Sequence, residues 1–418
     1  MWFSSDRQRI QRDIEVLAQF TSSPGQGVTR FSFTAEDRAA REYIKQQMAA
    51  SHLQIREDAA GNVFGRREGR RSDAPVVMIG SHFDSVKNGG SFDGPAGVVA
   101  GLEIARILDE NQFITDYPFE FVAMIEEEGG RFGAGLFGSR AMAGKVFPTE
   151  LQNLRDQDGV SVAEAMRGFG LEPANITSAI RPADQLKAFF ELHIEQGPIL
   201  ENAKTAVGLV ETVVGIDQWE IEVQGRPDHA GTTPMDMRAD ALVAAADIVQ
   251  DLYRLGKQAG AGTVATVGKL QVWPGAGNIV PGTVVFSVDI RSAAAAKIQH
   301  ISEALRAAVY DLPERYPGVI TRIKPVLSVK PTALSETVLQ IFEEEARACG
   351  ITTQRMVSGA GHDAMIMAEL TEVGLIFVPS RGGRSHCPEE WTDYEQLQKG
   401  IDLLLSAILR MAEFRKPD

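Results

Sequence analysis

At residues 74–84 the chain reads Ala74-Pro75-Val76-Val77-Met78-Ile79-Gly80-Ser81-His82-Phe83-Asp84, a short apolar run that stops at polar side chains. Apolar residues then recur at helical spacing, at Val98, Leu102, Ala105 and Leu108. A buried strand followed by a helix is the repeating unit of an α/β fold with a largely parallel sheet. We therefore expect His82 and Asp84 at the carboxyl end of a strand, where open α/β sheets bind ligands.

Further elements around this stretch fit the same fold. Residues 119–125 and 188–194 predict two more buried strands, each running into a polar cluster. Thr34 predicts the cap of a helix that includes residues 39–48. The clusters are therefore expected along one edge of the sheet.

The pattern changes near residue 208. Trp219, Ile221 and Val223 alternate with polar residues, which predicts a half-exposed strand. A helix over 238–255, strands over 263–272 and 283–290, a helix over 293–310 and a strand over 319–326 are expected to follow. This βαββαβ order is typical of a ferredoxin-like sandwich. We expect a mixed-sheet α/β/α catalytic domain (1–207 and 328–418) and an inserted ferredoxin-like α+β domain (208–327).

Composition excludes several classes of function. A chain of 418 residues is long enough for two domains, and its formal net charge of −14 argues against a nucleic-acid partner. The start has no signal-like pattern, and no apolar stretch is long enough to span a bilayer. The two cysteines, Cys349 and Cys387, do not constitute a disulfide framework. A cytoplasmic protein that acts on a small molecule, without a membrane partner, is expected.

Five histidines lie in polar, glycine-rich or strand-end contexts: His82, His193, His229, His362 and His386. Acidic residues accompany them at Asp84, at Asp93 in a glycine-rich turn, and at Glu126, Glu127 and Glu128 after a strand. Taken singly, these acids could be turn or solvated-loop residues. Together, His82, Asp93, Glu128, His193 and His386 supply enough nitrogen and oxygen ligands for two divalent ions sharing one carboxylate.

Motifs of other enzyme classes are either absent from the sequence or stand in the wrong structural context. The run Gly133-Ala134-Gly135-Leu136-Phe137-Gly138 matches a dinucleotide fingerprint, but an acidic segment separates it from the preceding strand. The sequence has no P-loop, H-E-x-x-H helix or G-x-S-x-G elbow. Nucleotide-dependent, zincin and serine-hydrolase chemistry are therefore disfavoured.

The ordered motifs resemble those of the M20 metallopeptidase superfamily over essentially the whole chain. The segments 191–198, 228–235 and 358–364 are similar to those of its branch of N-carbamoyl-L-amino-acid hydrolases, allantoate amidohydrolases and β-ureidopropionases. This resemblance implies a homodimeric, metal-dependent hydrolase of linear C–N bonds other than peptide bonds. It implies a small ureido substrate that carries a carboxylate.

The resemblance also implies a role for each candidate residue. One metal ion would be held by His82, Asp93 and His193, and the other by Asp93, Glu128 and His386; zinc, manganese, cobalt and nickel are all compatible. Asp84 would orient His82, and Glu127 would be the general base. The inserted domain would form the dimer and supply His229, which stabilises the oxyanion. The other substrate contacts would be Gln196, Asn278, Arg291 and His362.

Four functions remain possible at this point. Removal of the carbamoyl group from an N-carbamoyl-L-amino acid, giving amino acid, ammonia and carbon dioxide, is the first expectation. Allantoate hydrolysis, giving a ureidoglycine-type product, ammonia and carbon dioxide, is the main alternative. An aminoacylase or dipeptidase and a catalytically silent binding protein are the others, and the complete set of ligands with Glu127 disfavours the silent protein.

Overall fold

The computed structural model describes residues 4–414, which divide into two compact units. The first unit contains the described residues up to Glu211, Ala333–Met356 and the described residues from Gly361 onward. The second contains Thr212–Thr332 and Val357–Ala360. None of the helices within residues 4–414 has the length and apolar character needed to cross a bilayer.

Within the described residues, nine strands form the large mixed sheet of the first unit. Its order is β1 (Gln54–Glu57), β2 (Val63–Arg67), β4 (Phe119–Met124), β3 (Val76–His82), β5 (Leu186–Ile194), β14 (Glu372–Val378), β6 (Val207–Val213) and β12 (Thr332–Ala333), with β13 (Thr353–Ser358) paired to β6. Strand β3 is parallel to β4 and β5, and β5 is parallel to β14. Their carboxyl ends therefore lie along one edge of the sheet.

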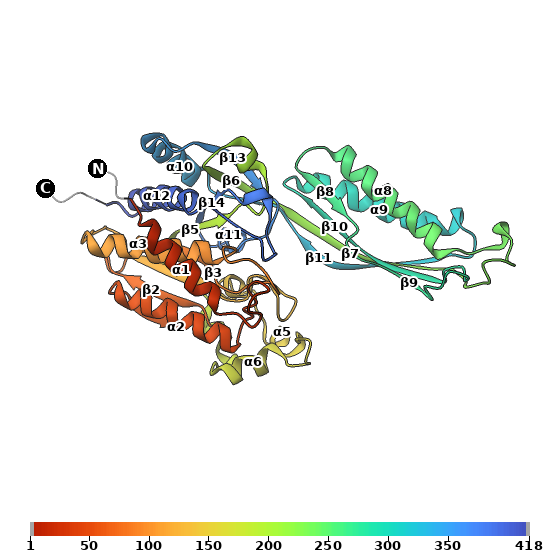
Figure 1. Cartoon of the computed structure of the whole chain (residues 1–418), viewed down its shortest axis with the longest axis horizontal. Coiled ribbons are helices and arrows are strands. Elements are labelled where there is room, and N and C mark those ends of the chain that lie inside the picture. Colours follow the sequence, from red (N-terminus) through yellow and green to blue (C-terminus); the bar gives the residue numbers. More distant parts are fainter. Residues whose placement is uncertain (1–3, 415–418) are drawn as a thin grey trace. The chain divides into compact units, whose positions relative to one another are not determined.

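Helices pack on this sheet around a continuous apolar core (Figure 1). Helix α3 (Pro95–Glu110) contacts β3, β4 and β5, whereas α12 (Tyr394–Met411) and α11 (Asp363–Met367) contact β5 and β14. The other helices of the unit are α1 (Arg7–Gln19), α2 (Ala35–Ala50), α4 (Phe137–Met142), α5 (Pro148–Asn153), α6 (Val162–Phe169), α7 (Ile199–Ala203) and α10 (Glu336–Cys349), with 3-10 turns η1 (Pro173–Ala179), η2 (Ala183–Gln185) and η4 (Arg381–Gly383).

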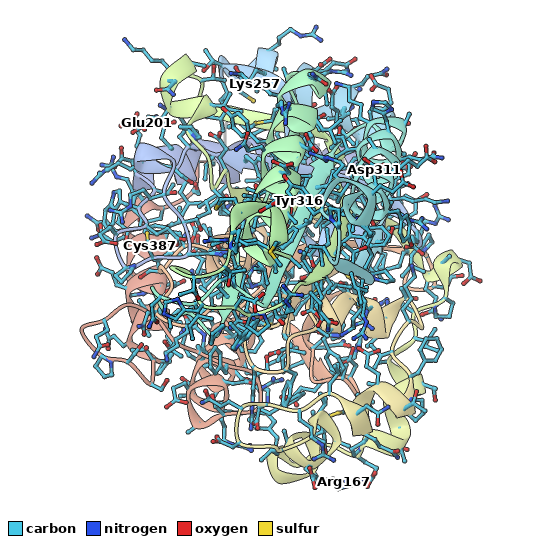
Figure 2. All side chains as sticks on the ribbon, turned by 90° about the vertical axis from the view of Figure 1, so that its right-hand side faces the viewer. Arg167, Glu201, Lys257, Asp311, Tyr316 and Cys387 are labelled. Carbon is cyan, nitrogen blue, oxygen red and sulfur yellow. The ribbon has the colours of Figure 1, made fainter. Side chains whose placement is uncertain are left out.

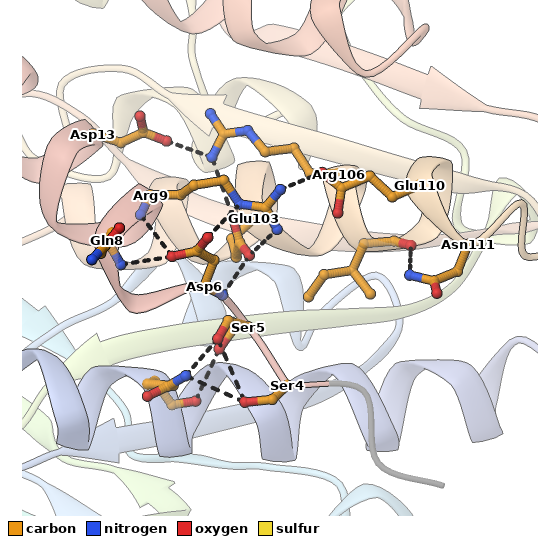
Figure 3. A network of polar contacts seen from close by, with 12 residues as sticks. Ser4, Ser5, Asp6, Gln8, Arg9, Asp13, Glu103, Arg106, Glu110 and Asn111 are labelled. Carbon is orange, nitrogen blue, oxygen red and sulfur yellow. Dashed lines mark hydrogen bonds and ion pairs between the residues drawn. The ribbon is translucent and has the colours of Figure 1, made fainter.

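Polar contacts join Asp6 and Arg9 to α3 (Figure 3). The buried Glu103 carboxylate accepts hydrogen bonds from the Asp6 amide at 2.8 Å and from the Arg9 guanidinium at 2.7 Å. Arg106 forms an ion pair with Asp13 of α1 at 2.6 Å. The charges buried between α1 and α3 are therefore paired, as burial requires.

Local rules explain why the elements predicted for this unit form. Strands β3, β4 and β5 occupy the predicted apolar runs, and the Thr34 side chain accepts the Asp37 amide to cap α2. Gly80 lets β3 approach β4, because a Cβ at this position would lie 1.9 Å from the Val122 carbonyl oxygen. The predicted mixed-sheet α/β fold is confirmed.

The second unit is an antiparallel sheet with helices on it. Its elements are β7 (Gly215–Gln224), η3 (Met235–Met237), α8 (Ala241–Ala259), β8 (Thr263–Thr266), β9 (Leu270–Trp273), β10 (Thr283–Ser292), α9 (Ala295–Arg315) and β11 (Ile320–Val329). The strand order is β11-β7-β10-β8, and β9 also pairs with β10. Side chains of α8, α9 and the sheet share one apolar core. Tyr316, labelled in Figure 2, donates to Asp247 of α8 at 2.5 Å and so links the two helices.

One strand predicted for this unit is interrupted in the structure. The single strand expected over 263–272 is two strands, β8 and β9, both paired with β10. Four steps from Thr266 to Leu270 lie opposite three steps of β10, so one extra residue bulges out. The Ser287 hydroxyl oxygen accepts the Lys269 amide at 3.0 Å beside the break.

Candidate metal centre

His82 is the last residue of β3, and its ring is 1% exposed. Its Nδ1 atom lies 3.5 Å from the Asp84 carboxylate and 3.3 Å from the Asp84 carbonyl oxygen. The same carboxylate accepts the backbone amides of Glu127 at 3.0 Å and Glu128 at 3.1 Å. Asp84 therefore contacts both His82 at the end of β3 and the backbone that follows β4.

Asp93 lies between two groups of side chains. Its Oδ1 atom is 3.6 Å from His82 Nε2 and 3.2 Å from His193 Nε2, and its Oδ2 atom is 3.2 Å from His386 Nε2. The next residue, Gly94, has a φ of +81°, and a Cβ there would lie 2.4 Å from the His82 ring. A glycine is therefore required for Asp93 to reach this position.

Two sets of three ligands result from this arrangement. His82, Asp93 and His193 form one set, and Asp93, Glu128 and His386 form the other. In each set the potential ligand atoms all lie within 4.8 Å of one another. Asp93 belongs to both sets, and mixed nitrogen and oxygen ligands of this kind bind divalent transition metals.

Each ligand set contains a buried atom without a hydrogen bond, and such atoms show whether cations fit there. His193 Nε2 and Glu128 Oε1 are buried without a hydrogen-bond partner among residues 4–414. His193 Nδ1 contacts the Ile194 carbonyl oxygen at 2.9 Å, so its hydrogen belongs on Nδ1 and the lone pair of Nε2 faces Asp93. Leaving such atoms unsatisfied is costly, and cations would satisfy them. The residues therefore fit a pair of metal ions.

Glu127 differs from Glu128 in its surroundings. Glu127 is in neither ligand set, and its Oε2 atom lies 3.7 Å from His82 Nε2. Burial raises the pKa of Glu127 well above its usual range; the Glu128 carboxylate adds to this effect and the His82 ring opposes it. A carboxylate that holds a proton so readily beside a metal centre suits general base chemistry.

His386 and Gln196 approach Asp93 from outside the strands. Both have positive φ angles, +56° for His386 and +57° for Gln196, which is strained backbone for residues other than glycine. Gln196 donates from Nε2 to Asp93 Oδ2 at 2.7 Å. Contacts with Asp93 and Glu128 raise the pKa of His386 to about 11.

His362 lies directly against the first ligand set. Its ring packs edge-on against the His193 ring with centroids 4.5 Å apart. Burial foremost, and the charge of His193, hold the pKa of His362 well below its usual range. The His362 ring is therefore expected to be neutral beside the metal centre.

The remaining candidates, His229, Asn278 and Arg291, belong to the second unit. His229 Nδ1 accepts the Gly231 amide at 3.0 Å, which places the hydrogen on Nε2. The Asn278 carbonyl oxygen accepts the Ala230 amide at 2.9 Å, so His229 and Asn278 lie on neighbouring segments. Arg291 donates to both oxygens of Asp289, at 2.8 and 3.1 Å, and lines a hollow of about 640 Å³.

Three polar residues of the centre were not predicted from the sequence: Asp363 and Glu390, which are buried, and Ser385, which is half-buried. Glu390 and Ser385 contact the Asp93 turn, and Asp363 has its pKa raised to about 7 by burial and by Glu191. Glu390 and Ser385 lie within four residues of His386 in the sequence. An acidic residue so close to a candidate ligand was the available signal.

Comparisons with known proteins give consistent results. The sequence model of Peptidase family M20/M25/M40 matches residues 78–410. An N-carbamoyl-L-amino-acid amidohydrolase of Paenarthrobacter aurescens is 48% identical, over 95% of this chain and 96% of its own length. An allantoate amidohydrolase of Bacillus subtilis is 35% identical, over 98% of both. The crystal structure of an amidase of the hydantoinase/carbamoylase family from Burkholderia multivorans superposes with a TM-score of 0.90 at 35% identity, covering 99% of each chain.

Proposed function

Since the chain belongs to Peptidase family M20/M25/M40, we propose that it is a metal-dependent amidohydrolase that removes the carbamoyl group from an N-carbamoyl-L-amino acid. The products would be the amino acid, ammonia and carbon dioxide. The observation that carries this proposal is the shared position of Asp93 between two ligand sets, each of which has a buried ligand atom, His193 Nε2 or Glu128 Oε1, without a hydrogen-bond partner among the described residues. The 48% identity to the N-carbamoyl-L-amino-acid amidohydrolase of Paenarthrobacter aurescens supports the choice of substrate.

The proposed cofactor is a pair of divalent ions, zinc or manganese, cobalt or nickel. His82, Asp93 and His193 would hold one ion, and Asp93, Glu128 and His386 the other. When bound, such ions polarise the ureido carbonyl and make water more acidic. Asp84 keeps His82 and the Glu127–Glu128 backbone in place through its contacts with all three residues.

Glu127 is proposed as the general base. Its carboxylate takes the proton from the attacking water and later delivers it to the leaving nitrogen. Its backbone amide is held by Asp84, and its side chain is not one of the ligand groups, so the proton acceptor is positioned independently of the ligands.

The remaining residues are proposed to bind the substrate. Arg291 presents a planar cation that suits the substrate carboxylate, and His229 presents an Nε2 hydrogen that suits a developing oxyanion. Asn278, Gln196 and His362 are the other proposed contacts. The second unit is proposed to form a homodimer, and the enzyme is proposed to act in the cytoplasm.

A substrate panel tests the proposal. Metal-free protein is supplied in turn with zinc, manganese, cobalt or nickel, and release of ammonia is measured from N-carbamoyl-L-amino acids, allantoate and 3-ureidopropionate. An N-acetyl amino acid and a dipeptide, followed by release of the free amino acid, complete the panel. The highest kcat/KM is expected on an N-carbamoyl-L-amino acid, with activity lost on chelation.

Allantoate is the second candidate substrate, because the allantoate amidohydrolase of Bacillus subtilis aligns over 98% of both chains. A higher kcat/KM on allantoate would assign that reaction instead. Preference for the dipeptide, or full turnover after exhaustive chelation, would refute the proposed function.

A further inference from the structure

Glu390 is a buried acid beside the metal centre that the proposed mechanism does not use. Glu390 is only 4% exposed to solvent. Oε1 accepts the backbone amides of Phe92 at 2.9 Å and Asp93 at 3.0 Å. Oε2 contacts the Ser385 hydroxyl at 2.6 Å. Every oxygen of this carboxyl group therefore holds a segment that carries a candidate metal ligand.

Ser385 extends this contact to Asp93 itself. Its hydroxyl oxygen also lies 2.8 Å from Asp93 Oδ2, so its single hydrogen can be donated either to this oxygen or to Glu390 Oε2. Ser385 immediately precedes His386. Glu390, Ser385 and Asp93 thus connect the turn before α3 to the segment after η4, almost 300 residues later in the chain. Cross-links of this kind orient metal ligands.

Packing around Glu390 is tight. A Cβ on Gly90 would lie 2.1 Å from Glu390 Oε1, so the turn that carries Asp93 lies directly against the carboxyl group. The Phe92 ring packs edge-on against the Trp391 ring, with centroids 5.3 Å apart. These contacts leave the Asp93 turn little freedom as long as Glu390 is present.

The two ligand sets depend on Glu390 to different extents. His82 and His193 are residues of β3 and β5, and sheet hydrogen bonds hold those strands independently of Glu390. Asp93 and His386 lie outside strands, and His386 has a φ of +56°. Strained backbone persists only where its surroundings hold it. Asp93 is common to both sets, but the other two ligands of the first set, His82 and His193, are fixed by strands. The set of Asp93, Glu128 and His386 therefore relies on Glu390 more than the first set does.

We propose that Glu390, acting through Ser385, is a positioning residue that sets the affinity of the cation held by Asp93, Glu128 and His386. Glu390 itself does not ligate the cation. This inference rests on the proposed two-metal centre. Loss of an outer partner of a metal ligand typically weakens metal binding about 10- to 100-fold.

Cobalt titration of the metal-free full-length protein tests this inference. Binding is followed by Co²⁺ absorbance and by calorimetry, for the wild type and for Glu390→Ala, Ser385→Ala and Glu390→Gln. Glu389→Ala is the matched control, because Glu389 is an exposed neighbour that pairs only with Arg384 among the described residues. The wild type and the control are expected to bind two equivalents.

Glu390→Ala and Ser385→Ala are expected to bind the first equivalent normally and the second about 10- to 100-fold more weakly. Glu390→Gln is expected to keep the wild-type affinities. Its amide oxygen can accept the Phe92 and Asp93 amides, and its amide nitrogen can donate to Ser385, which then donates to Asp93. A general packing role would not produce loss at one site alone, nor rescue by Gln.

Wild-type affinities for both ions in Glu390→Ala and Ser385→Ala, or equal weakening of both ions, would overturn the inference. If Glu390→Ala does not fold, the smaller change Ser385→Ala decides between these outcomes. A wild-type protein that binds fewer than two cobalt ions would instead refute the two-metal centre on which the proposed function depends.

Discussion

Replacing Glu127 with Gln separates base chemistry from metal binding. The change exchanges one carboxylate oxygen for an amide group of nearly equal volume and removes the proton acceptor. Glu127 belongs to neither ligand set, and its backbone amide remains bonded to Asp84. Both cations are therefore expected to stay bound while turnover collapses.

The expected magnitude follows from the role of the group. A positioned general base contributes about 10²- to 10⁴-fold, which corresponds to about 3–5 kcal/mol of activation free energy. Burial raises the pKa of Glu127, and the base must be ionised to act. Wild-type kcat/KM should therefore fall as pH decreases through this pKa, and Glu127→Gln should lack that dependence.

The assay combines metal content by mass spectrometry with ammonia release from an N-carbamoyl-L-amino acid between pH 5 and 9. Glu128→Gln is the matched comparison, because Glu128 is a member of a ligand set and its loss should lower the metal content as well. Turnover of Glu127→Gln within tenfold of the wild type would refute the assignment of the base. Loss of metal from Glu127→Gln would place it among the ligands.

Metal uptake should release protons, because contacts with Asp93 and Glu128 raise the pKa of His386 to about 11 in the metal-free protein. Affinity for the cation held by His386 should rise by up to about tenfold per pH unit from pH 6 to 9, measured by cobalt titration, and a pH-independent affinity would contradict this. Burial, together with Glu345, raises the pKa of Cys349 to about 12, so iodoacetamide at pH 8 should label it at least ~100-fold more slowly than a free thiol, as followed by peptide mass spectrometry. Gly80→Ala should lower the Tm strongly, because its Cβ would meet the β4 backbone. Gly168→Ala, at an open position in helix α6, should leave the Tm unchanged or slightly raised. Calorimetry that ranks the two variants the other way would refute this packing argument.

Local signals in the sequence account for much of the fold. The apolar runs that become β3, β4 and β5 and the capping residue Thr34 act over a few neighbouring residues, so their effect is readable without coordinates. The break between β8 and β9 was not readable. Its cause lies in the pairing of both strands with β10, which is distant in the chain.

In the candidate metal centre, too, local sequence reveals some residues and tertiary packing alone reveals others. Strand-end histidines such as His82 and His193 could be singled out because a strand end is a local feature, and the carboxyl ends of strands in open α/β sheets bind ligands. The sequence places two acidic residues, Glu389 and Glu390, close to His386, but local sequence does not tell which of them contacts the centre. One is buried against the Asp93 turn and the other is exposed, and only packing decides which.

The sequence by itself determined that strands β3, β4 and β5 and helices α2 and α3 form in the first unit, and which side chains are chemically able to bind cations. Hydrophobic periodicity and residue type are properties of short stretches, so no tertiary contact is needed to read them. Tertiary structure alone decided that Asp93 faces His193 with one oxygen and His386 with the other, and that Glu390 and Ser385 hold this arrangement. Those contacts join residues from 100 to almost 300 positions apart, and their geometry is set by the packing of the whole unit.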